Sequence, residues 1–166
     1  CMFELRLLTP TDAATRSALV FDPAFHDVDT LLERVTPNVV DVTQLNGVAA
    51  QVQRHVQASP ALQRYVLDLW QATQTPQAFD LRLPDVEMDQ LILAGASPRG
   101  MMALMRAARV VAWLAGRDHL LPEDVTAVVP AVLGHRVFFT PVYELRRATL
   151  ADAFVNQLLQ RVPTPR

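Results

Sequence analysis

The most regular pattern of apolar and polar residues in the chain runs over residues 98–115. At about 100° per residue, one side of this stretch is apolar and carries Met101, Leu104, Met105, Ala108, Val111, Ala112 and Ala115. Ser97 can accept a free N–H of the first turn, and Pro98 suits the first helical position because its missing N–H costs nothing there. Gly116 suits a left-handed helix end. The pattern therefore predicts a helix that starts at Pro98 and packs its apolar side in a core.

The opposite side of this helix carries two arginines. Arg99 and Arg106 lie within about 20° of each other around the helix, and Val110 and Trp113 share their side. Arg99 falls in the first turn, where the helix dipole favours anions, and its planar guanidinium matches the oxygens of a phosphate. Two interpretations stay open at this point: an arginine that contacts a phosphate, or an amphipathic core helix with solvated arginines.

Weaker patterns predict the other elements. In the first half of the chain they are a short strand over 2–8, a helix from Thr11 to about residue 19, a helix from Asp41 or Thr43 to about residue 57, and a helix over 60–73 capped by Ser59. In the second half they are an irregular acidic loop over 74–89, a helix from Pro122 that Pro130 ends or kinks, an extended segment over 135–139, and a last helix from Thr149. Tyr65 and Trp70 are interpreted as packing residues. The fold class predicted is mainly α, a helical bundle with a short N-terminal strand and little other β-structure.

Composition narrows the classes of protein further. Apolar residues make up 51% of the 166 positions, which argues for a packed core rather than disorder. A net charge of −2 argues against a nucleic-acid partner that is held by its phosphates. No run approaches about 18 apolar residues, so we expect no membrane span. The single cysteine, Cys1, excludes an internal disulfide and agrees with a cytoplasmic location.

The chain contains no lysine, so all 15 of its basic residues are arginines. A phosphate-binding loop of the G-x-x-x-x-G-K-[ST] type needs a lysine to reach the terminal phosphates. The histidines and the cysteine show no metal-ligand spacing, and no set of side chains has the pattern of a catalytic site. We therefore expect no catalytic residue and no metal site here, and we expect that the chain alone does not hydrolyse ATP.

A series of short motifs, in the same order, resembles the lid of the MoxR-family AAA+ ATPases. The motifs are Gly95-Ala96-Ser97-Pro98-Arg99, Arg106-Ala107-Ala108-Arg109, Gly116-Arg117-Asp118, Pro122-Glu123-Asp124-Val125, Pro130 and His135-Arg136. The resemblance is dense over 95–137 and looser from the start of the chain to residue 75. It implies that Arg99 is the sensor-2 residue, which reaches the nucleotide phosphates from the lid, with Pro98 and Ser97 in the same nucleotide-binding stretch.

The resemblance also implies a division of the chain. Residues 1–40 would be a linker and the edge of the nucleotide-binding core, and residues 41–166 would be the helical lid. Because the chain begins at Cys1, we expect it to be a fragment whose N-terminal AAA+ core is missing, so that the strand over 2–8 has lost its sheet. The parent protein would bind ATP and Mg²⁺, whereas we expect no cofactor in the fragment. By resemblance, the parent forms a ring, commonly a hexamer, and acts as a chaperone on partners such as proteins with a von Willebrand factor A domain.

A second class of function is a stand-alone helical adaptor or a DNA-binding module. Residues 97–125 have the order helix, short turn, helix, as in a helix-turn-helix motif. The stretch Pro122-Glu123-Asp124 argues against DNA, because it would place acids against the phosphates. The pair His135-Arg136 fits either a set of helix-end cations or the packing seam of a lid.

Overall fold

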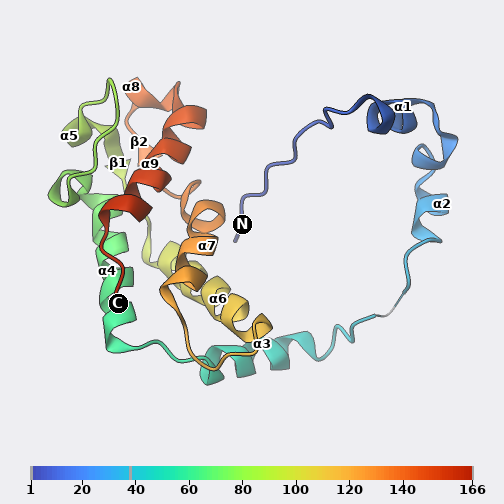
Figure 1. Ribbon diagram of the computed structural model, residues 1–166, viewed down its shortest axis with the longest axis horizontal. Helices are drawn as coiled ribbons and strands as arrows, with labels where there is room; N and C mark the ends of the chain where they lie inside the picture. Colours follow the sequence, from blue (N-terminus) through green and yellow to red (C-terminus); the bar gives the residue numbers. More distant parts are fainter. Residues whose placement is uncertain (1, 38, 166) are drawn as a thin grey trace. The chain divides into compact units, whose positions relative to one another are not determined.

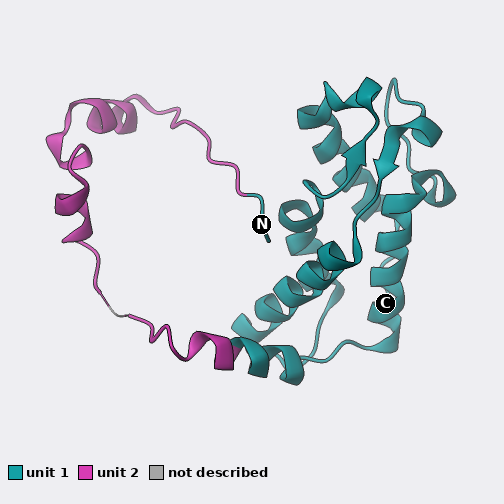
Figure 2. Cartoon of the chain, turned by 180° about the vertical axis from the view of Figure 1, so that it is seen from behind, with its two compact units in different colours: residues 1–4, 49–166 teal, residues 5–48 magenta. Residues whose placement is uncertain are grey.

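The computed structural model describes residues 2–37 and 39–165, and its helices and strands are labelled in Figure 1. The chain divides into two compact units, shown in different colours in Figure 2: Leu5–Val48 forms one, and Cys1–Glu4 together with Ala49–Arg166 forms the other. This division reflects the compactness of the chain and not its function. The predicted functional boundary at residue 41 therefore stays a prediction.

The unit Leu5–Val48 contains the short helices α1 (Ala13–Phe21), η1 (Pro23–Phe25) and α2 (Val28–Leu32), none of which has a buried residue. The cap of α1 is Asp12 rather than the predicted Thr11, because the Asp12 carboxylate accepts the Thr15 N–H at 2.7 Å. Asp22 and Asp27 cap the next two helices in the same way. These helices therefore begin where local side chains satisfy their free N–H groups.

The strand predicted over residues 2–8 is not formed, because the structure assigns no strand to residues 2–11. Leu7 and Leu8 are almost fully exposed, at 95% and 89%. A strand needs a neighbour that pairs with its N–H and C=O groups along its length. Before that exposed stretch, Glu4 instead donates its N–H to the carbonyl of Ala131, at 2.8 Å.

Apart from the segment up to Glu4, the larger unit begins at Ala49, within α3 (Leu45–His55), and continues with α4 (Pro60–Gln74). Ser59 caps α4 as predicted, with its hydroxyl accepting the Leu62 N–H at 3.2 Å. The region predicted as an irregular loop over 74–89 contains the short helix η2 (Pro76–Phe79) and the start of α5 (Met88–Leu91).

Besides α4, three longer helices surround the core of this unit. They are α6 (Pro98–Leu114), α7 (Pro122–Leu133) and α9 (Arg147–Arg161), with α6 packed along α7 (Figure 1). The fully buried side chains include Leu62, Leu69, Leu91, Leu104, Val125, Val129, Leu133 and Leu158. The predicted apolar stripe of α6 is confirmed at Met101, Leu104, Ala108 and Ala112, which are buried, whereas Ala115 is exposed.

The helix α7 does not end at Pro130 but continues to Leu133. Pro130 is exposed, and inside the helix it costs the missing N–H and the crowding of the preceding turn. The last helix, α9, begins at Arg147 rather than at Thr149, since the carbonyl of Arg146 already accepts the N–H groups of Thr149 and Leu150.

The described residues form one small antiparallel sheet of two strands, and an isolated parallel bridge joins Gln57 to His119. The strand β1 (Ile92–Ala94) pairs with β2 (Phe138–Phe139), with Ile92 opposite Phe139, and a short helix α8 (Pro141–Glu144) follows. The guanidinium of Arg147 lies over the rings of Phe138 and Phe139, at 5.9 and 5.5 Å, and holds this pair against α9. Over the described ranges, each helix is too short or too polar to cross a membrane.

Candidate functional site

The start of α6 places Arg99 as the sequence predicts. Ser97 is the N-cap, and its hydroxyl accepts the Gly100 N–H at 3.2 Å, while Pro98 occupies the first helical position. The far end is also as predicted, because Gly116 has a left-handed φ of 73°. Arg99, Pro98 and Ser97 are all exposed. Within the described part of the chain, the Arg99 side chain has no hydrogen bond or ion pair, so its charge is available at the positive end of a helix.

A cluster of hydrogen bonds holds the loop that precedes α6. The indole N–H of Trp70 and the side-chain amide of Gln74 both donate to the carbonyl of Ala96, at 2.7 and 2.9 Å. The hydroxyl of Thr73 accepts the N–H of Ala96 at 3.0 Å and donates to the carbonyl of Trp70 at 2.7 Å. We call these three side chains of α4, together with Ala96, the Ala96 clamp. It ties the residue that precedes the N-cap of α6 to the end of α4.

The backbone on both sides of the cap is tightly packed. A Cβ atom on Gly95 would lie 2.5 Å from the carbonyl oxygen of Thr73, and a Cβ on Gly100 would lie 2.8 Å from the side chain of Arg136. Glycine is therefore required at position 95, where the neighbour is backbone, whereas at position 100 a larger residue would displace the Arg136 side chain. The first turn of α6 is held against α4 on one side of the cap and against Arg136 on the other.

A groove of about 410 Å³ borders the same region, between α4 and α6. Its lining includes Leu67, Trp70, Pro98, Met101 and Met102. Met102 and Leu67 are more than half exposed, at 65% and 56%. The start of α6 therefore combines an exposed cation with an apolar surface.

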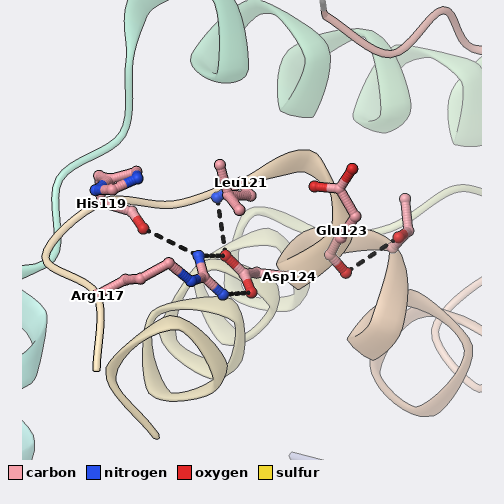
Figure 3. Close-up of polar contacts among 6 residues, drawn as sticks. Arg117, His119, Leu121, Glu123 and Asp124 are labelled. Atoms are coloured by element: carbon pink, nitrogen blue, oxygen red, sulfur yellow. Dashed lines mark hydrogen bonds and ion pairs between the residues drawn. The ribbon is translucent and has the colours of Figure 1, made fainter. Parts of the chain in front are cut away.

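The turn between α6 and α7 is held by a bidentate ion pair, shown in Figure 3. The guanidinium of Arg117 donates to the two carboxylate oxygens of Asp124 at 2.7 and 2.6 Å, and Leu121 donates its N–H to the same carboxylate at 2.8 Å. Burial raises the pKa of the Asp124 carboxyl, but the hydrogen bonds from Arg117 and Leu121 outweigh it, so that the pKa lies below its ordinary value. Asp124 lies in the first turn of α7, and its pairing with Arg117 was not predicted.

The pair His135-Arg136 lies at the end of α7. Arg136 donates to the carbonyls of Val132 and Met2, so it acts as a cation at a helix end. Burial lowers the pKa of His135, and the neighbouring charge of Arg136 lowers it further, so the imidazole is neutral near pH 7. The helix-end interpretation therefore fits Arg136 and does not fit His135.

The AAA lid domain family matches residues 88–158, which include α6 with Arg99 in its first turn, and α7. The chain is 46% identical over 164 residues to the protein MoxR of Methylorubrum extorquens and 43% identical to the protein MoxR of Paracoccus denitrificans, in each case over 99% of this chain. The chain belongs to the MoxR family of AAA+ ATPases. Its helical architecture is that of an AAA lid, as the motifs over 95–137 indicate.

This MoxR-family chain is also similar to one further relative and to one solved structure. It is 34% identical over 126 residues to a protein of Mycobacterium tuberculosis named chaperone MoxR1. The matched region covers 75% of this chain and 31% of that protein. It also resembles the crystal structure of a candidate ATPase from Cytophaga hutchinsonii, with a TM-score of 0.61 and 28% identity over 70% of this chain and 34% of the other. The chain spans about half the length of the two MoxR relatives, 48% in each case.

Proposed function

We propose that this chain is the lid of an ATP-hydrolysing MoxR-family protein and that Arg99 is its sensor-2 arginine, contacting the phosphates of ATP held by an N-terminal AAA+ core. The observation that supports this role most directly is the free guanidinium in the first turn of α6, where charge and helix dipole favour an anion together. Ser97 and Pro98 set the start of that helix and so fix where Arg99 projects.

The nucleotide would be ATP with Mg²⁺, and its binding would be shared between the core and this lid. This chain offers a single contact to a phosphate and no lysine, so the core would supply the phosphate loop and the Mg²⁺ ligands. Among residues 2–37 and 39–165, no group of three potential metal ligands is close enough to hold an ion. The lid therefore contributes an electrostatic contact rather than the hydrolytic chemistry.

The contact gives the lid a way to respond to hydrolysis. When the terminal phosphate leaves, Arg99 loses its anionic partner, and the equilibrium between lid positions shifts by the free energy of that contact. The start of α6 is held to α4 and lies against Arg136, so a displacement of Arg99 would move these elements together. The lid would in this way convert the state of the nucleotide into a movement.

The wider setting is proposed from the family. The parent protein would form a ring, commonly a hexamer, in the cytoplasm and act as a chaperone on partners such as proteins with a von Willebrand factor A domain. The name chaperone MoxR1, carried by the relative from Mycobacterium tuberculosis, supports the chaperone part of this proposal. The DNA-binding alternative loses support, because the AAA lid match includes both helices of the supposed helix-turn-helix.

The test is ATP turnover by a protein that contains both halves, with Arg99→Ala against Arg106→Ala. Both arginines are exposed on one side of α6, but Arg106 lies two turns beyond the helix start. Loss of a charged hydrogen bond should lower turnover about 10- to 100-fold in Arg99→Ala and leave Arg106→Ala near the unmodified protein. Equal turnover in the two variants would refute the sensor-2 role. Micromolar binding of ATP to this chain alone, measured by calorimetry, would contradict the shared site.

A further inference from the structure

We propose that Trp70 and Gln74 are positioning residues for Arg99, acting through the Ala96 clamp. The inference rests on the proposed sensor-2 role and adds two residues of α4 to it. Neither side chain belongs to the stretch that contains Arg99, and both donate to one carbonyl three residues before it. Their function would be to fix the position of the guanidinium rather than to contact the nucleotide.

The clamp satisfies more than the hydrogen-bonding needs of a buried loop. Ala96 is fully buried, and one donor would be enough to satisfy its carbonyl oxygen. Instead, two side chains four residues apart on the same face of α4 donate to it, and the buried hydroxyl of Thr73 accepts the N–H of the same residue. Both backbone groups of Ala96 are thus bonded to α4, which leaves this peptide little freedom to rotate.

The link from Ala96 to Arg99 is short and stiff. Ser97 is held by its capping bond to Gly100, and the ring of Pro98 fixes its own φ. Gly100 is packed against the side chain of Arg136, which restricts the other end of the turn. A shift of Ala96 would therefore be passed to the start of α6 and to Arg99. Contacts to a reacting phosphate are sensitive to displacements of about 1 Å, so a loosened clamp should weaken the contact.

The experiment measures kcat and KM for ATP in the protein that contains both halves. Gln74→Ala removes one donor from an exposed side chain, and Trp70→Phe removes the other donor while keeping an aromatic ring. Gln71→Ala is the matched control, because Gln71 lies on the same helix and bonds to Thr75 instead of the loop. Each substitution is made in the wild-type protein and again in the Arg99→Ala variant. Thermal unfolding is followed for every variant.

The expected result is a fall in kcat/KM of about two- to tenfold for Gln74→Ala and for Trp70→Phe, with no change for Gln71→Ala. In the Arg99→Ala background neither clamp substitution should lower kcat/KM further, because the residue that it positions is gone. A purely structural role would lower the melting temperature and reduce turnover equally in both backgrounds.

The outcomes separate the two proposals. If Arg99→Ala lowers turnover and the clamp substitutions have no effect, or the same effect in both backgrounds, the positioning role is refuted and the sensor-2 role stands. If Arg99→Ala leaves turnover unchanged, the sensor-2 role fails, and the positioning role fails with it. Should Trp70→Phe fail to fold, Gln74→Ala decides alone, since its side chain is on the surface.

Discussion

The ion pair between Arg117 and Asp124 offers the sharpest test of how the lid is held together. Replacing Asp124 by Asn keeps the shape of the side chain and removes its charge. The wild-type carboxylate accepts two bonds from Arg117 and one from the Leu121 N–H, all between 2.6 and 2.8 Å. In the variant the amide NH₂ group would face the guanidinium, so one of the two Arg117 bonds would be replaced by a contact between donors.

The cost follows from the burial of the two partners. Asp124 is 3% exposed and Arg117 is 25% exposed. Breaking a fully buried pair typically costs about 3–5 kcal/mol, because the remaining charge is left without a partner. Here the guanidinium can recover part of its hydration, and the Asn oxygen can still accept the Leu121 N–H. We therefore expect Asp124→Asn to lower the free energy of unfolding by about 2–4 kcal/mol at pH 7.

The pH dependence has a definite sign. The pKa of Asp124 in the folded chain lies below the ordinary value of 3.8, despite the opposing effect of burial. A carboxyl with a lowered folded pKa stabilises the fold above its unfolded pKa, and this contribution is lost as the pH falls through the folded pKa. The difference in stability between the wild type and Asp124→Asn should therefore be constant above about pH 5 and shrink below about pH 4.

The assay is urea unfolding of the chain, followed by circular dichroism at a series of pH values. The matched control is Glu123→Gln, since Glu123 lies in the same first turn of α7 and is exposed; it should change the unfolding free energy by less than about 0.5 kcal/mol. An equally small change for Asp124→Asn would refute the structural role of the pair. A difference that stays constant down to pH 3 would refute the assignment of the pH dependence to Asp124.

Four further substitutions test the core, the clamp and the helix α3 by the same unfolding assay. Leu104→Ala should cost about 2–5 kcal/mol, because Leu104 is fully buried; a loss below about 0.5 would mean that α6 does not pack in the core. Gly95→Ala should cost about 1–3 kcal/mol through its contact with the Thr73 carbonyl, whereas Gly47→Ala, with no atom within 4 Å of the new Cβ, should stabilise α3 by up to about 1 kcal/mol. Thr73→Val should cost about 1–3 kcal/mol, since it leaves the Ala96 N–H without its acceptor.

Helix starts could be predicted from the sequence because their causes are local. The side chain of Ser97 caps α6 within three residues, and Pro98 adds its fixed φ to the same signal. The stripe of α6 is equally local, since its period is set by the helix itself. The same reasoning identified Ser59 as the cap of α4. These features need no knowledge of the rest of the chain, and they account for the position of Arg99.

Contacts between distant segments could not be predicted in this way. The pairing of β1 with β2 joins residues on either side of α6 and α7, and the short run Phe138-Phe139 has no period of its own. The interpretation of Trp70 as a packing residue was incomplete, because its indole N–H donates to Ala96. Nothing in the local pattern around Trp70 distinguishes a ring that only packs from one that also holds a loop. For α8, the pair Thr140-Pro141 was an available start signal, but a helix of four residues has no detectable stripe.

The arginines around α6 and α7 differ in their partners more than in their chemistry. Arg109 donates to Val56 and Gln53, and Arg117 is paired with Asp124, so both charges serve the fold. Arg99 and Arg106 are exposed, with no such partner among the described residues. Exposure alone therefore cannot assign a function to Arg99. The difference between the two is position: the dipole acts within the first turn of α6, where Arg99 lies, and has faded at Arg106. A comparison of these two arginines consequently separates a phosphate contact from a general effect of positive charge on that face.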